Sequence, residues 1–293
     1  MSEISTFSTY RTLLLELYKR YSDIRVGSGK GFKIPPSVML NKYAYETKTS
    51  ILEGVFSSPF SLYKRGIGKS VYCLKCLYNV YGKNIDEVMK HIVFMPHDFL
   101  RLFKEAVDKN IRINMIVWDD AGFWIGSSRW NNKFVKAIRE FINVIRTHVV
   151  TLMVNAPRMR EIARGVRDNL DIIDLVRIED FYFDLEKRRS IVYMYDVDYL
   201  EVMRVDRRRS LPEPLISWVF KQYLEWYPLY EEKRKEYVKI GVMRTEEALK
   251  EISNEASREL EEISKSYEIR LNDLDVEKEV KLDEDEEDDE DST

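Results

Sequence analysis

One short stretch sets the expected architecture of this chain: Tyr63-Lys64-Arg65-Gly66-Ile67-Gly68-Lys69-Ser70. Glycines at this spacing let consecutive backbone N–H groups turn toward one anion, as a triphosphate requires. The lysine after them reaches the β- and γ-phosphates, and the serine hydroxyl binds Mg²⁺. The stretch therefore predicts a loop that binds ATP through Gly66, Ile67, Gly68, Lys69, Ser70 and Val71, with Ser70 also a Mg²⁺ ligand.

A strand and a helix are expected on either side of this loop. Ser58–Leu62 is the predicted strand that leads into it, and Val71–Val80 is the predicted helix that leaves it. Such a helix points its N-terminus, where the helix dipole favours negative charge, at the phosphates. Cys73 and Cys76 lie on this helix without a second ligand pair at zinc spacing, so we interpret them as core residues.

A second motif follows in Ile113-Asn114-Met115-Ile116-Val117-Trp118-Asp119-Asp120. An apolar run that ends abruptly in two aspartates is typical of a buried parallel strand whose carboxyl end opens into a cleft. Asp119 is expected beside Ser70, where it would hold the Mg²⁺ through the water shell of the ion. Asp120 is the expected catalytic residue that orients or deprotonates the attacking water. The pair alone would equally suit solvated acids at a strand end, so the interpretation depends on the upstream loop.

A third motif is the β-rich run Val149-Val150-Thr151-Leu152-Met153-Val154-Asn155. An asparagine at the tip of a strand beside the Asp-Asp strand can hydrogen-bond the γ-phosphate or the attacking water. Asn155 is therefore a candidate catalytic residue. Asn155-Ala156-Pro157 also suits a plain turn, because asparagine and proline are standard turn residues, and the sequence leaves both interpretations open.

In this order, the three motifs resemble P-loop ATPases of the additional-strand class, and within it the AAA+ initiator and helicase-loader group of DnaA, DnaC and IstB. The resemblance covers roughly Phe56 to Ile178. Tyr63 departs from the family, which has its first glycine there. High charge, abundant tyrosine and a single glutamine, Gln222, are similar in style to small ATPases carried by viruses and plasmids of hyperthermophilic archaea.

The resemblance also implies a homo-oligomer in which an arginine reaches into the nucleotide of the neighbouring subunit. Arg164 and Arg167, in the basic run after Asn155, are the candidates for this catalytic role, which stabilises transition-state charge in trans. A basic helix on the solvent side would give the same pattern.

A β-hairpin with aromatic arms and a charged tip is predicted over Phe181–Tyr195. The tip residues Lys187, Arg188 and Arg189 are candidate contacts to a nucleic-acid backbone, and so are Arg207, Arg208 and Arg209 further on. Aromatic residues among basic ones suit single-stranded nucleic acid, but they equally suit a packed hairpin with a solvated turn.

Strands that alternate with helices predict an α/β fold: a three-layer P-loop core with a parallel sheet, and a ligand at the carboxyl ends of its strands. Residues 1–50 are expected to form an N-terminal helix and loop extension, and residues 51–200 the ATPase core with its hairpin. A helical extension is expected over 201–275, with a helical pattern through Trp218, Tyr223, Trp226 and Tyr230. Residues 276–293 are expected to be a disordered acidic tail.

Charge and composition limit the classes of protein to consider. The nine acids of residues 283–291 contribute −9 to a formal net charge of −4, which leaves +5 on the rest of the chain. Such a block repels itself and favours disorder. The chain has no long apolar run, no secretory signal and only two cysteines. We therefore expect no membrane span and a cytoplasmic location, in the host cytoplasm if the chain is viral.

These expectations predict a Mg²⁺-dependent ATPase that acts on DNA or on a DNA-bound partner, in replication initiation or helicase loading. Two alternatives stay open. One is a DNA-translocating or packaging ATPase of the HerA–FtsK type, whose sensor position usually holds glutamine rather than an asparagine such as Asn155. The other is a nucleotide-gated adaptor that binds ATP and hydrolyses it poorly, which Tyr63 and an aspartate in place of the common glutamate both favour.

Overall fold

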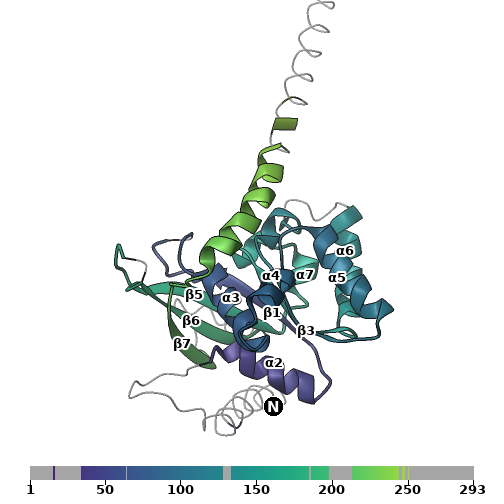
Figure 1. Cartoon of the computed structure of the whole chain (residues 1–293), viewed down its shortest axis with the longest axis horizontal. Helices are drawn as coiled ribbons and strands as arrows, with labels where there is room; N and C mark the ends of the chain where they lie inside the picture. Colours follow the sequence, from purple (N-terminus) through teal and green to yellow (C-terminus); the bar gives the residue numbers. More distant parts are fainter. Residues whose placement is uncertain are drawn as a thin grey trace, which may run out of the picture. The chain divides into compact units, whose positions relative to one another are not determined.

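A seven-stranded sheet forms the centre of the described part of the chain, in the spatial order β2-β3-β4-β1-β5-β6-β7 (Figure 1). The computed structural model describes residues 34–63, 65–127, 133–184, 186–197 and 213–243, together with 16, 246, 247 and 250. The strands are β1 Ile51–Ser57, β2 Ile92–Val93, β3 Ile113–Trp118, β4 Val149–Asn155, β5 Ile172–Asp180, β6 Arg189–Asp196 and β7 Ile216–Lys221.

The sheet is mixed but mostly parallel. Strands β2, β3, β4, β1 and β5 are parallel to one another, whereas β6 pairs antiparallel with β5 and β7 pairs antiparallel with β6. The predicted α/β architecture is confirmed at this level. The predicted parallel sheet holds for these five strands, whereas β6 and β7 continue it antiparallel after the hairpin between β5 and β6.

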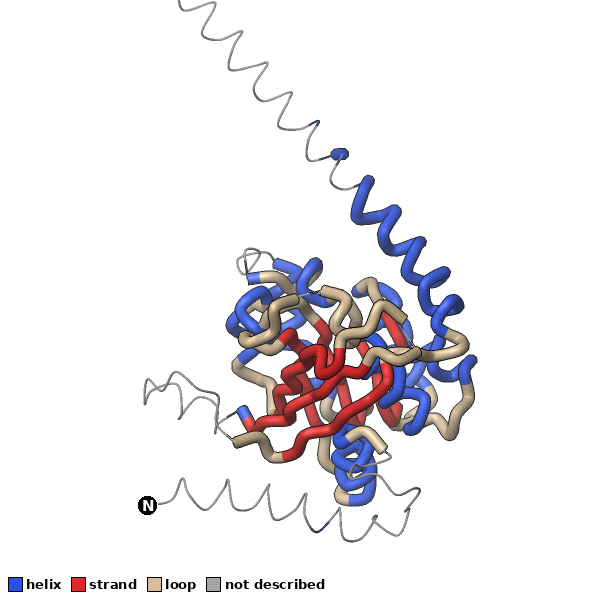
Figure 2. Tube along the Cα trace, turned by 90° about the vertical axis from the view of Figure 1, so that its left-hand side faces the viewer, coloured by secondary structure: helices blue, strands red, loops and turns tan. Residues whose placement is uncertain are grey.

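Helices cover both faces of the sheet (Figure 2). The connection from β1 to β2 crosses the sheet in one direction, and the connections from β2 to β3 and from β3 to β4 return in the other. Because such crossovers are right-handed, helices of the first connection lie on one face and those of the other two on the opposite face. The helices are α2 Pro36–Glu46, α3 Lys69–Val80, α4 Ile85–His91, α5 Pro96–Asp108, α6 Lys133–Ile145 and α7 Arg164–Arg167, with 3-10 turns η1 Ala121–Phe123 and η3 Met159–Glu161.

Strand β1 holds the central place in the parallel part, between β4 and β5, and all seven of its residues are buried. It replaces the predicted strand Ser58–Leu62, which lies in the following loop. In the sheet register, Val55 is paired with Asn155, and β3 pairs with β4 on the other side. Because carboxyl ends of parallel strands meet at one edge, the ends of β1, β3 and β4 converge there.

Helix α2 belongs to the core, although the sequence placed residues 1–50 in an extension. Pro36 begins the helix in its first turn, where proline is tolerated. Leu40 is buried in an apolar cluster with residues of the sheet, and Nδ2 of Asn41 donates to the carbonyl oxygen of Asn114 in β3 at 2.6 Å. These contacts tie α2 to the sheet.

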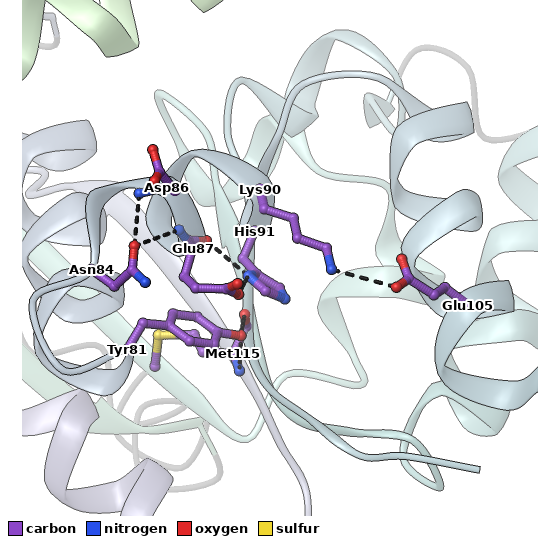
Figure 3. Close-up of polar contacts among 8 residues, drawn as sticks. All are labelled: Tyr81, Asn84, Asp86, Glu87, Lys90, His91, Glu105 and Met115. Atoms are coloured by element: carbon purple, nitrogen blue, oxygen red, sulfur yellow. Dashed lines mark hydrogen bonds and ion pairs between the residues drawn. The ribbon is translucent and has the colours of Figure 1, made fainter. Parts of the chain in front are cut away.

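Helix α4 is fixed at both ends by side chains (Figure 3). Oδ1 of Asn84 accepts the backbone N–H of Glu87 at 3.3 Å, which caps the helix N-terminus. At the other end, the ring of His91 stacks on Tyr81 with 4.3 Å between centroids, and the Tyr81 hydroxyl donates to the carbonyl oxygen of Met115 at 2.8 Å. Burial lowers the pKa of His91, so this histidine serves packing as a neutral ring.

The C-terminal part corrects the helical extension predicted over 201–275. The pattern through Trp218 forms strand β7, in which buried and exposed residues alternate, and a helix follows at 227–243. The chain divides into two compact units, Met1–Glu232 and Lys233–Thr293, so β7 belongs to the first unit and residue 200 does not mark the division. Within the second unit the described residues are helical. The predicted acidic tail and Arg207, Arg208 and Arg209 lie outside the described residues.

Candidate functional site

The loop between β1 and α3 turns at two glycines. Gly66 and Gly68 have φ values of 66° and 90°, in the left-handed region that side chains disfavour. Gly68 is also the N-cap of α3. The helix therefore begins with Lys69, Ser70 and Val71, the residues whose backbone N–H groups make a helix N-terminus attractive to phosphate.

Strands β6 and β7 brace this loop. A Cβ atom on Gly68 would lie 3.0 Å from Oγ of Ser190 and 3.2 Å from Cγ of Gln222. The Ser190 hydroxyl donates to the carbonyl oxygen of Ile67 at 2.8 Å and accepts from Nε2 of Gln222 at 2.6 Å. Neither Ser190 nor Gln222 stands in a sequence motif that predicts a site residue. The one available signal was that Gln222 is the only glutamine of the chain.

Lys69 places its ammonium group between the end of β1 and the acid pair. Its Nζ donates to Oγ of Ser57 at 3.3 Å. Burial lowers the pKa of Lys69, while the negative charges of Asp119 and Asp120 act in the opposite direction. The charges of the acid pair thus favour the protonated form of the loop lysine.

Asp119 lies at the centre of a polar cluster. Its side chain is fully buried, and its Oδ1 accepts from Nδ2 of Asn155 and from the backbone N–H of Asp120 at 2.9 Å. The same Nδ2 atom of Asn155 lies 3.4 Å from Oγ of Ser70. The structure therefore brings residues of all three sequence motifs into one cluster.

The two aspartates lie in different surroundings. Asp120 has φ 51° and ψ 30°, a left-handed conformation that aspartate tolerates better than most residues, and it begins the turn η1. This turn leaves Asp120 half-buried, whereas Asp119 is fully buried. The buried carboxylate suits the binding of a cation, and the half-buried one suits contact with a water molecule.

A residue from outside the three motifs completes the cluster. Tyr230, in the helix over 227–243, donates its hydroxyl to Oδ2 of Asp119 at 2.5 Å, and its side chain is fully buried. The sequence places Tyr230 in a helical pattern, but nothing in that pattern points to the acid pair.

These side chains fit a triphosphate with Mg²⁺. The hard oxygen atoms of Ser70 and Asp119, both within reach of one amide group, are the ligands that Mg²⁺ prefers. Lys69 and the glycine loop supply the positive charge and backbone donors that phosphates need. In addition, Oδ1 of Asn155 is buried and has no hydrogen-bond partner among the described residues. A bound ligand would satisfy this atom.

Tyr63, the departure from the family pattern, lies outside the glycine turn. Its ring stacks on Phe181, with 5.8 Å between centroids and 20° between planes. The hairpin arms are β5 and β6, so Phe181, Tyr182 and Phe183 lie in the hairpin loop and not in an arm as predicted. Tyr63 therefore joins the loop between β1 and α3 to the hairpin rather than shaping the glycine turn itself.

The predicted arginines lie on the short helix α7. Arg164 pairs with Asp168 at 3.3 Å, and its side chain is 85% exposed. Arg167 is half-buried at the end of the same helix. Arg164 therefore presents its guanidinium group at the surface.

The basic hairpin residues are engaged within the hairpin itself. Lys187 pairs with Asp184 at 3.3 Å, and Arg189 forms an ion pair with Asp180. Nε of Arg188 donates to a backbone carbonyl of the same loop at 3.0 Å. The acids of the tip thus balance much of its positive charge.

Among the described residues, no helix is both long enough and apolar enough to cross a membrane.

No described protein family matches this chain. The chain is 26% identical over 191 residues to the uncharacterized protein B-251 of Sulfolobus spindle-shape virus 1, a match that covers 61% of this chain and 76% of that protein. It is 24% identical over 170 residues to the uncharacterized protein ORF286 of Acidianus two-tailed virus, a match that covers 55% of this chain and 56% of that protein. The chain thus spans just over half the length of the second relative. It is similar to proteins of archaeal viruses, as its composition indicated.

Proposed function

We propose that this chain binds ATP with Mg²⁺ at the loop Gly66–Ser70 and hydrolyses it. The observation that carries the proposal is the cluster at the carboxyl edge of the sheet, where Ser70, Asp119 and Asn155 are joined by hydrogen bonds. These residues come from three segments far apart in the sequence. Their chemical types are the ones that a triphosphate and its cation require.

Each side chain has one task in this proposal. Lys69 neutralises the β- and γ-phosphates, and Ser70 and Asp119 hold Mg²⁺, which withdraws charge from the phosphate oxygens when bound. Asp120 accepts a proton from the water whose oxygen attacks the γ-phosphorus, while the β–γ bridging oxygen leaves with ADP. Asn155 hydrogen-bonds the γ-phosphate or the attacking water.

The proposed target of this activity is DNA or a DNA-bound protein, as in replication initiation or helicase loading. The support for this target is the resemblance of the motifs to initiator and loader ATPases. The hairpin adds little electrostatic support, since Lys187 and Arg189 are paired within it. Arg164, exposed at the surface, is the proposed arginine that acts on the neighbouring subunit of a homo-oligomer.

A nucleotide-gated adaptor is the second candidate function, and one observation favours it. Both carboxylate oxygens of Asp119 already accept hydrogen bonds from protein groups, Oδ1 from Asn155 and Oδ2 from Tyr230. A carboxylate that is held in this way suits slow metal loading and weak hydrolysis.

The binding test uses the full chain and labelled ATP, with Mg²⁺ or with a chelator. Lys69→Ala should lower ATP affinity by at least about ten-fold, because a charge-assisted hydrogen bond to phosphate is lost. Lys104→Ala, which removes an exposed lysine of α5, is the matched control and should bind ATP as the wild type does. A wild-type protein that does not bind ATP would refute the proposal.

The turnover test measures phosphate release with and without single- and double-stranded DNA. Asp120→Asn should retain ATP binding but lose about 100-fold or more in turnover, because the proton acceptor is gone. Asp108→Asn, at the exposed end of α5, is the matched control. Wild-type binding without turnover, even with DNA and at high protein concentration, would favour the adaptor.

A further inference from the structure

Tyr230 connects the C-terminal helix to the carboxylate at the centre of the site. Its hydroxyl donates to Oδ2 of Asp119 at 2.5 Å, and both side chains are fully buried. Its ring packs against Phe94, with 5.7 Å between centroids, and against Tyr227 at 5.1 Å. Packing therefore fixes the ring and directs the hydroxyl at one carboxylate oxygen.

The other oxygen of Asp119 is engaged by the strand ends. Oδ1 accepts from Nδ2 of Asn155 and from the backbone N–H of Asp120. Because a carboxylate oxygen has two lone pairs, two donors take up the acceptor capacity of Oδ1. A cation or its bound water that uses Asp119 therefore meets Oδ2, where the Tyr230 hydroxyl already donates to one of the two lone pairs.

Tyr230 lies close to the end of the first compact unit. Tyr230 lies in the first turn of the helix over 227–243, and the first compact unit ends at Glu232. The ring of Trp226 packs against a tyrosine of α3, with 5.5 Å between centroids. Two aromatic side chains thus hold the segment 224–232 to the core directly before the second unit begins.

We propose that Tyr230 is a positioning residue that couples occupancy of the metal site to the segment 224–232. This inference rests on the proposed binding of ATP with Mg²⁺. Without nucleotide, the Tyr230 hydroxyl holds Asp119 through Oδ2 and keeps the segment in place. With the site loaded, the cation and the water molecules around it take up the negative charge of Oδ2, so the hydroxyl loses its contact and releases the segment.

A purely structural role for Tyr230 has different consequences. A buried tyrosine generally needs an acceptor for its hydroxyl, and Asp119 would then be no more than that acceptor. Loss of the hydroxyl would change stability but would not change the Mg²⁺ requirement of nucleotide binding. If the hydroxyl and the loaded metal site compete for Oδ2, in contrast, loss of the hydroxyl also changes the Mg²⁺ requirement of nucleotide binding.

The first test is hydrogen exchange of the wild-type protein over residues 224–232. It compares the protein alone, with Mg²⁺ alone, with a non-hydrolysable ATP analogue and chelator, and with the analogue and Mg²⁺ together. We expect exchange to rise by about ten-fold only in the last case, the factor that corresponds to a lost hydrogen bond to a charged group. Exchange that stays equal or slows with analogue and Mg²⁺ would overturn the proposal.

The second test compares Tyr230→Phe with Tyr81→Phe. Both variants keep the ring and remove a hydroxyl, but the Tyr81 hydroxyl bonds the backbone of Met115 instead of the acid pair. We expect the Mg²⁺ concentration for half-maximal binding of the analogue to fall by about ten-fold in Tyr230→Phe and to stay unchanged in Tyr81→Phe. An equal or higher Mg²⁺ requirement in Tyr230→Phe would overturn the proposal.

Different results would refute the proposed ATP binding and the proposed role of Tyr230. If the wild type and both variants show no saturable binding of the analogue with Mg²⁺, the proposed function is wrong, and the coupling falls with it. If all three proteins bind the analogue with one Mg²⁺ requirement, nucleotide binding stands and only the role of Tyr230 is refuted.

Discussion

Glu53 lies in the middle of β1 with its side chain fully buried, and Asp174 lies, also fully buried, on the neighbouring strand β5. Oγ of Ser37 donates to Oε1 of Glu53 at 2.5 Å and lies 3.3 Å from Oδ2 of Asp174. Burial, followed by the charge of Asp174, raises the pKa of Glu53 well above its usual value, and burial raises the pKa of Asp174 as well. The pair therefore keeps a proton at pH values where the unfolded chain releases it.

Removal of the Glu53 carboxyl group should change how stability depends on pH. Between the ordinary and the raised carboxyl pKa values the folded state binds more protons than the unfolded state, so stability falls as pH rises through that window. Glu53→Gln keeps the shape and cannot ionise. At about pH 8 it should be more stable than the wild type by on the order of 1 kcal/mol, and the gain should vanish below about pH 4.

Urea unfolding over a series of pH values measures this difference. Glu140→Gln, at an exposed position of α6, is the control and should follow the wild-type curve. If the stability curves of Glu53→Gln and the wild type run parallel across the pH range, the pKa of Glu53 is the same in the folded and unfolded states.

The residues of the site differ in how much of the sequence is needed to predict them. Lys69, Ser70 and Asp119 stand in short motifs, so neighbouring residues are enough to predict them. Ser190 and Tyr230 contribute through contacts with residues more than a hundred positions away. Their own neighbourhoods resemble an ordinary strand and an ordinary helix, and only the folded chain shows their partners.

The secondary structure elements also differ in how well the local sequence predicts them. Helix α3 and strands β3 and β4 were predictable, because their apolar patterns are continuous and end in polar residues. Strand β1 was misplaced because Glu53 and Gly54 interrupt its apolar pattern, although the folded sheet buries that carboxyl group, to which the Ser37 hydroxyl donates. Strand β7 was predicted as part of a helix. Aromatic residues occur both in the strand and in the helix that follows it, and they obscure the alternation of buried and exposed residues along the strand.

The packing of the loop between β1 and α3 on β6 and β7 can be tested with two glycine substitutions. Both Gly66 and Gly68 have positive φ, so alanine should cost about 1–2 kcal/mol of stability at either position. At Gly68 the new Cβ would also lie 3.0 Å from Oγ of Ser190, whereas at Gly66 it would have no atom within 4 Å. Overpacking should therefore add about 1–3 kcal/mol at Gly68 alone.

Unfolding free energies and ATP affinities of Gly66→Ala and Gly68→Ala check this expectation together. Gly68→Ala should be the less stable variant and the weaker binder, because its loop must move away from Ser190 and Gln222. Equal losses in the two variants would mean that β6 and β7 do not constrain the loop.

On the scale of the whole molecule, the candidate site depends on most of the first compact unit. The parallel strands supply the residues of the three motifs, whereas β6 and β7 brace the loop and Tyr230 holds Asp119. This arrangement spreads the site from β1 to the last residues before Glu232. Ligand binding should consequently stabilise the sheet and the loop after β1 together, while the segment 224–232 is released.

Thermal unfolding measures this coupling directly. A ligand that binds only the folded state at about 100 times its Kd adds about 2.7 kcal/mol of stability. For a unit of this size we expect ATP with Mg²⁺ to raise Tm by about 5–10 °C, since 1 kcal/mol corresponds to about 2–4 °C. ATP with a chelator should give a smaller shift, because Ser70 and Asp119 then hold no cation. Lys69→Ala should lose most of the shift and Lys104→Ala none of it. A shift of equal size in Lys69→Ala would place the nucleotide somewhere other than the loop after β1.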